Sequence, residues 1–234
     1  MIKLGNNDIT LKIGSADVSA AYLGSTLVYS GGTPTPILPS GYTEVEYIEN
    51  PSMAYINTGF KPNQDTRIVC TMQIVTSTHN GNFCGCGAWN KVNAMRFDYE
   101  PRATGTLHIS WGTKSSWTVY STCVGDYNKH TYDWDKNSFY RDDTLIGSVA
   151  YGNFQCTDNF GIFCPIEYGI TSSQDDYLKG KLFNRFQIYD DGVLVRDYVP
   201  VKRDSDNRYG LYDLLNNTFN TSATNVEFVG GNPV

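Results

Sequence analysis

The sequence lacks several features that would assign whole classes of function. No apolar run approaches the roughly 20 residues that a membrane-spanning helix needs. Positive charge is scarce, because 18 Lys and Arg stand against 24 Asp and Glu, for a formal net charge of −6. Phosphate binding needs a basic surface, so nucleic acid is not expected as a partner. No charged segment followed by an apolar core opens the chain, and we therefore expect no signal peptide and folding in a cytoplasm.

Motifs of enzymes and metal sites are also scarce. The chain shows no Gly-x-Ser-x-Gly elbow and no phosphate-binding loop, and its three histidines are scattered. Cys84 and Cys86 are separated by one residue, whereas zinc-binding pairs have about two to four between them. In a reducing compartment cysteine behaves as a small buried hydrophobe, which predicts structural thiols at Cys70, Cys84, Cys86, Cys123, Cys156 and Cys164. We accordingly predict a protein that is not an enzyme and needs no cofactor.

One short phrase occurs three times in the first thirty residues. Each copy runs from apolar residues to a glycine (Gly5, Gly14 or Gly24), then to a small or polar pair and back to apolar residues. Glycine adopts positive φ without steric cost, so short strands that turn back at these glycines are predicted. A segment this short cannot bury a core alone and should be stabilised by copies of itself or by another protein. The predicted oligomerisation or anchoring contacts are Ile2, Leu4, Ile9, Leu11, Ile13, Val18, Tyr22, Leu23, Val28 and Tyr29.

Glycine and proline then mark a boundary. Residues 30–40 contain two glycines followed by three prolines, a composition typical of a linker that is flexible at first and then extended. We therefore place a small β-repeat module at residues 1–29, a Gly/Pro linker at 30–40 and one main domain at 41–234.

The main domain alternates apolar and polar residues in short runs rather than at helical spacing. The clearest hairpin lies at 182–199, where Asp190-Asp191-Gly192 separates two alternating segments. Strands recurring about every 8–12 residues predict an all-β, antiparallel two-sheet jelly-roll sandwich. Further strands are predicted at 67–75, 95–99, 106–111, 117–121 and 130–134.

Both ends of the main domain resemble a known family. The residues that carry the resemblance are LPSGYTEVEYIE at 38–49, YINTGF at 55–60, YDDGVLVRDYVPV at 189–201 and GLYD at 210–213. Together they resemble the laminin-G / concanavalin A-like jelly-roll domains of tailed-bacteriophage structural proteins and of surface proteins of gut Bacteroidetes. The N-terminal repeats resemble the anchoring repeats that precede such domains in tailed-phage virion proteins. In this pattern Tyr42, Tyr47 and Tyr55 are expected to face the core or the adjoining strand, and Gly210 to mark a tight bend.

The resemblance implies a structural virion protein of a tailed bacteriophage, such as a head fibre, a tail fibre or a capsid decoration protein, with a crAss-like gut phage as the suggested source. It implies a homo-oligomer, preferably a trimer, with other virion proteins as partners, located in the virion after assembly in the bacterial host cytoplasm. The jelly roll would display a lectin-like surface for host-surface or mucus glycans. The open alternatives are a glycan-binding surface adhesin of a gut bacterium and a glycoside hydrolase.

Tryptophans and carboxylates are the candidates for sugar chemistry. Four side chains could stack on a glycan, although each is equally suited to a core: Trp89, Trp111, Trp117 and Trp134. The phrase EVEYIE at 44–49 resembles the carboxylate strand of laminarinase-type glycosidases, but alternation separates Glu49 from Glu44 and Glu46. We therefore expect an edge strand with a solvated acidic face.

Calcium is the one metal that the resemblance leaves open, because laminin-G relatives sometimes bind it at a sheet rim. The segment Asp204–Asn207 begins like a calcium loop, but Tyr209 stands where such a loop needs glycine. A surface turn is the expected structure, with a calcium site as the alternative.

Overall fold

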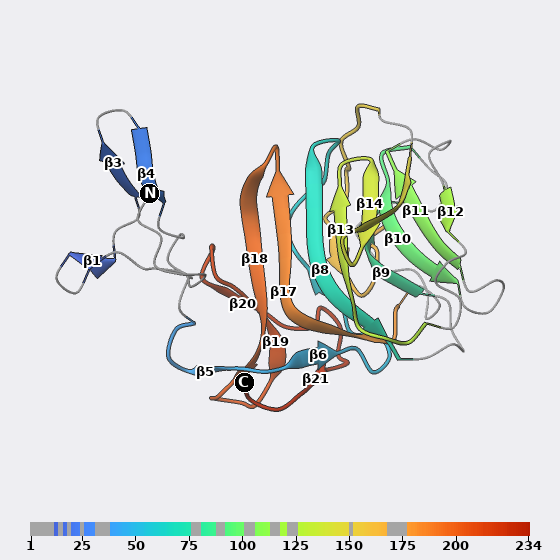
Figure 1. The fold of residues 1–234 in the computed structure, drawn as a ribbon. Helices are drawn as coiled ribbons and strands as arrows, with labels where there is room; N and C mark the ends of the chain where they lie inside the picture. Colours follow the sequence, from blue (N-terminus) through green and yellow to red (C-terminus); the bar gives the residue numbers. More distant parts are fainter. Residues whose placement is uncertain are drawn as a thin grey trace. The chain divides into compact units, whose positions relative to one another are not determined.

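The computed structural model describes residues 12–13, 16–17, 20–23, 26–30, 38–75, 81–87, 92–100, 106–112, 118–120, 126–149, 152–167 and 177–234. The chain divides into two compact units, Met1–Ile37 and Leu38–Val234, and the division falls inside the Gly/Pro segment 30–40. Every regular element among the described residues is a β-strand (Figure 1). No helix long and apolar enough to cross a membrane occurs in this part of the chain.

The first unit contains two antiparallel strand pairs. Strand β1 (Lys12–Ile13) pairs with β2 (Ala16–Asp17), and β3 (Ala20–Leu23) pairs with β4 (Thr26–Ser30). Short paired strands agree with what the repeats predicted, whereas the glycines themselves, Gly14 and Gly24, lie outside the described residues. Five of the predicted contact residues lie in these strands, namely Ile13, Tyr22, Leu23, Val28 and Tyr29. The other five, Ile2, Leu4, Ile9, Leu11 and Val18, lie outside the described residues, and a contact role for either set stays a prediction.

The second unit is a jelly roll of two antiparallel sheets. Its large, eleven-stranded sheet has the main order β15-β14-β13-β8-β17-β18-β19-β20, with β5, β6 and β21 joined to it at one end. The neighbours β8 and β17 are far apart in sequence, as the crossing connections of a jelly roll require. The strands are β5 (Tyr42–Glu44), β6 (Tyr47–Glu49), β8 (Thr66–Ile74), β13 (His130–Asp135), β14 (Ser138–Arg141), β15 (Thr144–Ser148), β17 (Gly180–Asp190), β18 (Val193–Arg203), β19 (Tyr209–Asp213), β20 (Thr218–Asn220) and β21 (Val229–Gly230).

The small, six-stranded sheet has the order β12-β11-β10-β9-β16-β7. Its strands are β7 (Ile56–Asn57), β9 (Gly81–Cys86), β10 (Met95–Glu100), β11 (Thr106–Trp111), β12 (Thr118–Tyr120) and β16 (Gly161–Ile162). The predicted all-β, two-sheet architecture is therefore confirmed.

Local strand predictions agree with the structure to within one or two residues at β8, β10, β11, β12 and β13. The predicted hairpin is formed by β17 and β18, which join through Asp191 and Gly192. Both turn residues have positive φ, 46° and 76°, as a two-residue hairpin turn that follows the strand twist requires.

The core lies between the inner faces of the two sheets. Phe83 and Phe97 of the small sheet stack with ring centroids 4.3 Å apart, and Phe97 meets Tyr132 of the large sheet at 5.1 Å. Trp111 and Trp134, again from opposite sheets, lie 5.5 Å apart. All five are buried, and these aromatic contacts join the two sheets across the core.

Five cysteines contribute to this interior as thiols outside any disulfide. Cys70, Cys84, Cys86, Cys156 and Cys164 are all buried, and Cys123 lies outside the described residues. Burial raises the pKa of the Cys70 and Cys84 thiols, which keeps them neutral. The five behave as the small hydrophobes that the sequence predicted.

Candidate functional site

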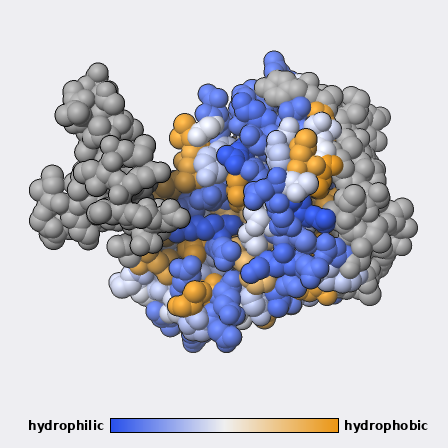
Figure 2. Space-filling model, viewed as in Figure 1, coloured by the Kyte–Doolittle hydropathy of each residue, from blue (hydrophilic) through white to orange (hydrophobic). Residues whose placement is uncertain are grey.

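The outer face of the large sheet is polar and accessible. Along β8, residues 66, 68, 70, 72 and 74 are buried, and the residues between them are half exposed. The strand β13 repeats this alternation, with Tyr132 and Trp134 buried and the residues beside them more exposed. The side of the jelly roll seen in Figure 2 is mostly hydrophilic, with hydrophobic residues in small groups. An accessible face of this kind is where a ligand could bind without unfolding the chain.

One end of this face is hollowed. We call this feature the Tyr47–Phe183 hollow; it has a volume of about 280 Å³ and is lined by Glu44, Val45, Glu46, Tyr47, Lys129, Phe183, Asn184 and Val234. Small-molecule sites begin at roughly 300 Å³, so the hollow suits one sugar-sized unit.

Two aromatic rings lie side by side in the hollow. Tyr47 of β6 and Phe183 of β17 are cross-strand partners, with ring centroids 5.3 Å apart. Lys181 Nζ lies 4.1 Å from the Tyr47 ring centre, and Lys129 Nζ lies 5.0 Å from that of Phe183. Both rings are half buried, so each keeps apolar surface that the C–H face of a sugar could cover.

A β-bulge brings Asn184 into the same hollow. Successive strand residues normally point to opposite faces, yet Phe183 and Asn184 both line it. The register of β17 against β8 shifts between Phe183 and Phe186, and Asn184 has a φ of 54°. Asparagine tolerates this left-handed conformation better than most residues, so the sequence suits the bulge that aims its amide here.

The carboxylates of Glu44 and Glu46 complete the lining. Both side chains are exposed, whereas Val45 between them is buried and its backbone N–H donates to Pro200 O at 3.0 Å. Glu49 is absent from the lining and pairs instead with Lys181 at 3.6 Å. The predicted separation of Glu49 from the other two is therefore confirmed.

The predicted edge strand at 44–49 is only partly correct. The segment forms two strands, of which β5 pairs with β18, while β6 lies between β17 and β21. Between the two strands Val45 forms a β-bridge with Pro233, and the backbone N–H of Glu46 donates to Asn232 O at 2.9 Å, so the segment changes its partner there from β18 to the C-terminal residues.

The groups in the hollow match a polyhydroxylated ligand. Carboxylates accept hydrogen bonds from hydroxyls, the Asn184 amide donates and accepts, and the Lys129 ammonium donates. Among the described residues, Lys129 contacts the Phe183 ring and has no carboxylate within ion-pair distance. Its donors therefore remain available to a ligand.

A second hollow lies on the same face near the other end of β17. We call it the Arg67–Tyr189 hollow; its volume is also about 280 Å³, and its lining is Asp65, Arg67, Asp135, Lys136, Tyr189, Asp191 and Gly192. Arg67 donates from Nε and Nη2 to Asp133 at 2.9 and 2.6 Å, which raises the pKa of the guanidinium. Lys136 pairs with Asp65 at 3.4 Å. The cations of this hollow are thus already engaged by the protein.

The outer face of the small sheet is polar but buried. Its buried polar residues are Asn82, Arg96, Asp98, His108 and Ser110. The Arg96 guanidinium lies 3.2 Å from Asn82 Oδ1, 3.3 Å from Asp98 Oδ1 and 3.6 Å from Glu167. Gly85 gives this side chain room, since a Cβ there would lie 3.1 Å from Arg96 Cγ. We call Asn82, Arg96, Asp98, His108 and Ser110 the buried row. The contacts of Arg96 offset the free-energy cost of burying its charge and that of Asp98.

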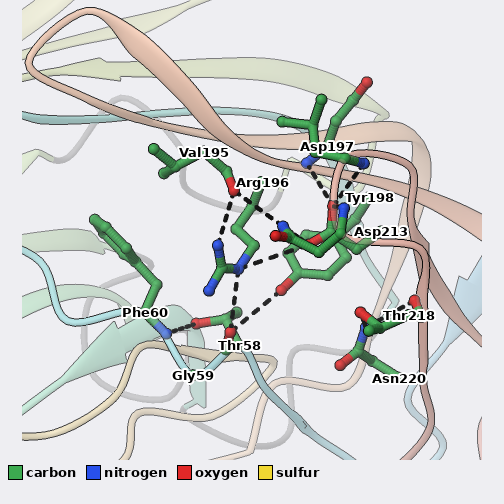
Figure 3. A network of polar contacts seen from close by, with 12 residues as sticks. Thr58, Gly59, Phe60, Val195, Arg196, Asp197, Tyr198, Asp213, Thr218 and Asn220 are labelled. Atoms are coloured by element: carbon green, nitrogen blue, oxygen red, sulfur yellow. Dashed lines mark hydrogen bonds and ion pairs between the residues drawn. The ribbon is translucent and has the colours of Figure 1, made fainter. Parts of the chain in front are cut away.

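Another polar network, in the large sheet, surrounds the fully buried carboxylate of Asp213 (Figure 3). Its Oδ1 accepts from the backbone N–H groups of Asp197, Leu215 and Asn216 at 3.3, 3.1 and 3.3 Å. Arg196 Nε lies 3.6 Å from its Oδ2. The terminal residue of the GLYD phrase therefore fastens the β19–β20 turn to β18, a structural role.

The same network joins the two sheets. Arg196 Nε and the Tyr198 hydroxyl, both from β18, lie 3.4 Å from the carbonyl oxygen of Thr58, which follows β7 of the small sheet (Figure 3). The Thr58 hydroxyl donates in turn to Phe160 O at 2.7 Å. The burial that accompanies these contacts raises the pKa of Tyr198. Both ends of the resemblance, YINTGF and RDY, thus meet in space.

Gly210 corrects one expectation about these phrases. It lies within β19 and not at a tight bend. A Cβ on Gly210 would come within 2.4 Å of Asn220 O and 2.8 Å of the Phe219 ring. Glycine is needed here for the close approach of β20.

The tyrosine expectations are confirmed. Tyr42 packs on Tyr212 at 4.7 Å, Tyr47 packs on the adjoining β17, and Tyr55 meets Tyr177 at 6.1 Å. The segment Asp204–Asp206 forms the predicted surface turn, with Arg203 paired to Asp206.

Two of the four tryptophan candidates lie in the core. Trp111 and Trp134 are at most 2% exposed and pack on each other in the core, so neither presents a face to a glycan. Core packing, the alternative that the sequence left open, accounts for these two. Trp89 and Trp117 lie outside the described residues.

Sequence reasoning missed Lys129, Phe183 and Asn184. Their places in the hollow depend on the β6–β17 register and on the bulge, and neither leaves a local pattern that a single sequence reveals.

Comparison with known proteins supports the fold. No protein-family model matches the sequence, and no curated protein matches it. Among solved structures, the chain is similar to a candidate carbohydrate-binding protein from Bacteroides ovatus, with a TM-score of 0.52 and 12% identity over 82% of this chain. The match spans only 62% of the Bacteroides protein. A heptameric SAP-like pentraxin from Limulus polyphemus matches over 63% of this chain and 74% of its own, with a TM-score of 0.40 and 13% identity. At 12% identity, the likeness to the Bacteroides protein concerns the fold alone, which is a concanavalin-like jelly roll.

Proposed function

We propose that the jelly roll is a lectin-like domain that binds glycans in the Tyr47–Phe183 hollow. The observation that carries the proposal is the pairing of two accessible rings with two exposed carboxylates, an amide and an ammonium that meets no carboxylate in the part of the chain that the structure describes. The Bacteroides ovatus relative, described as a candidate carbohydrate-binding protein, supports the same ligand class. Sugars suit such a lining because they have apolar C–H faces and hydroxyl edges.

In this proposal the whole chain is a structural virion protein of a tailed bacteriophage, a head or tail fibre or a decoration protein. The support is the resemblance of the N-terminal repeats and of the jelly-roll end phrases. The N-terminal unit anchors the chain to other virion proteins or joins three copies. A trimer displays three hollows, and this multivalency strengthens weak sugar binding to a mucus or a host surface.

The ligand proposal is tested with a glycan array that carries bacterial surface polysaccharides and mucin O-glycans. The full chain should bind a limited set of glycans, and the Glu44→Gln/Glu46→Gln variant should lose that binding. Glu227→Gln is the matched control, since Glu227 is an exposed carboxylate that pairs with Arg208 away from the hollow. Absence of binding by the wild-type chain, or equal binding by the double variant, would count against the proposal.

The assembly proposal is tested by light scattering on the full chain and on the Leu23→Asp/Val28→Asp variant. We expect a trimer that becomes a monomer, because two charges would be placed on the predicted contact set. A monomeric wild-type chain would remove the trimer and favour a decoration protein docked on another virion component.

Glycoside hydrolysis is the second candidate, because Glu44 and Glu46 line one hollow together. A retaining enzyme needs two carboxyl groups about 5–5.5 Å apart across the sugar bond. Release of reducing sugar from an array hit by the wild-type chain, and not by Glu46→Gln, would favour it over binding alone.

A further inference from the structure

A histidine next to the hollow is held between two carboxylates. His130, the first residue of β13, has its Nδ1 2.5 Å from Asp142 Oδ2 and its Nε2 2.8 Å from Asp126 Oδ2. Its side chain is only 14% exposed. Asp142 belongs to the β14–β15 turn, and Asp126 lies just before β13, so the ring joins two separate segments.

Both contacts are hydrogen bonds only when the ring is protonated. An ionised carboxylate accepts and cannot donate, and a neutral imidazole has a single N–H. Burial would raise the pKa of Asp126 and Asp142, yet hydrogen bonds from backbone N–H groups and from His130 outweigh it and leave both pKa values below the usual range. The two carboxylates are therefore ionised throughout the pH range in which histidines change charge.

One further cation and one further carboxylate lie beside these groups. Arg141 Nη1 lies 3.3 Å from Asp126 Oδ2, and Asp143 is adjacent in the turn. The residue opposite His130 on β8 is the neutral Met72, and the Tyr132 ring lies 6.2 Å away. When His130 is protonated, the carboxylates of Asp126 and Asp142 thus meet two cations among the described residues, His130 and Arg141.

The segment that His130 holds leads directly to the hollow. Asp126 Oδ1 accepts from the backbone N–H of Asn128 at 3.0 Å, and Tyr127 O accepts from Gln73 Nε2 at 2.8 Å. Lys129, which follows Asn128 in the chain, reaches the Phe183 ring in the hollow.

We propose that protonated His130 is a positioning residue for the Tyr47–Phe183 hollow: its bonds to Asp126 and Asp142 fix the segment 126–129 and so hold Lys129 at the Phe183 ring. The proposal rests on glycan binding in that hollow. Loss of the ring proton removes one donor and sets a nitrogen lone pair against a carboxylate, so the segment loosens. Arg141 and Gln73 still hold part of it, and glycan binding therefore weakens by about fivefold, as expected for one lost hydrogen bond, rather than disappearing.

The first experiment needs no ligand. Backbone order parameters of residues 126–129 are measured by NMR on the full chain at about pH 5.5 and about pH 8, the range in which histidines change charge. Wild type should be ordered at the lower pH and looser at the higher one. His130→Gln should be equally loose at both, and Asp143→Asn, which removes a charge from the same turn, should behave as wild type. Equal order at both pH values in wild type, or wild-type order in His130→Gln, would overturn the proposal.

The second experiment measures binding of the full chain to immobilised porcine gastric mucin at the same two pH values. Wild type should bind about fivefold more weakly at the higher pH, whereas Lys129→Met and His130→Gln should bind weakly and without pH dependence. Binding by wild type that does not change with pH would refute the positioning role. Absence of mucin binding at both pH values would instead count against the proposed ligand, and the order parameters would then decide the role of His130.

Discussion

The two hollows on the outer face of the large sheet have the same volume and differ in what their polar groups already bind. In the Arg67–Tyr189 hollow, Arg67 is held by Asp133 and Lys136 by Asp65. In the Tyr47–Phe183 hollow, Lys129 lies against a ring and has no carboxylate partner among the described residues. The comparison teaches that volume does not distinguish the two hollows, and that the groups left available for a ligand are the basis for proposing the Tyr47–Phe183 hollow as the site.

The buried row extends this comparison to charges that are both engaged and inaccessible. Arg96→Met would leave Asp98 buried without its cation, and removing one partner of a buried pair costs about 3–5 kcal/mol of unfolding free energy. Arg67→Met is the matched control; Arg67 is 41% exposed, so the loss should stay below about 1 kcal/mol. Urea unfolding of the full chain measures both. Equal losses for the two variants would show that burial does not separate the two regions.

The Asp213 network is expected to be the next most sensitive region. Asp213→Ala removes the acceptor of three backbone N–H groups and should lower the unfolding free energy by about 2–3 kcal/mol. Asp206→Ala, in an exposed turn, serves as the control and should change stability little. Thermal unfolding is the measurement, and equal midpoints for both variants would contradict a structural role for the GLYD phrase.

Binding should separate the two hollows more clearly than stability does. Phe183→Ala should weaken glycan binding at least tenfold, about 1.4 kcal/mol, because it removes a stacking face. Tyr189→Ala removes a ring from the Arg67–Tyr189 hollow and should leave the affinity for the glycan unchanged. Calorimetric titration with a glycan identified on the array provides the affinities. A larger effect of the Tyr189 variant would reverse the assignment of the two hollows.

The smallest effect is expected at the exposed Arg203–Asp206 pair. The hydrogen bond from Arg203 lowers the pKa of Asp206 to about 2, so Arg203→Gln should raise that pKa toward the ordinary value of about 3.9. Because the pKa of Asp206 is lower in the folded state than in the unfolded state, its ion pair stabilises the fold at pH values above the unfolded-state pKa. That contribution is lost as the pH falls toward 2. Because the pair lies in a surface turn, we expect the pKa to move in a carboxyl NMR titration without a measurable change in unfolding. If the pKa of Asp206 stayed near 2 in this variant, its low value would be due to the backbone N–H of Arg208 in the turn and not to Arg203.

The sequence predicted the architecture well because alternation and turn chemistry are local signals. The runs at β8, β10, β11 and β13 show period-two alternation, and Asp191-Gly192 is a turn whose conformation those residues specify. Gly210 was misinterpreted because glycine serves both bends and close approaches, and only the position of Phe219 distinguishes them.

The candidate site was far less predictable. Tryptophans were proposed as stacking residues because of their chemistry, but Trp111 and Trp134 fill the space between the sheets. The rings that remain accessible, Tyr47 and Phe183, are brought together by pairing between strands far apart in sequence. Asn184 joins them through a bulge, which depends on the register of three strands.

The most direct test of the account is chemical-shift mapping by NMR on the full chain, titrated with a glycan that the array identifies. We predict that the largest shifts occur at Tyr47, Lys129, Phe183 and Asn184, with the Arg67–Tyr189 hollow unaffected. Shifts concentrated at the Arg67–Tyr189 hollow or on the small sheet would contradict the claim that the available polar groups beside Tyr47 and Phe183 form the glycan site.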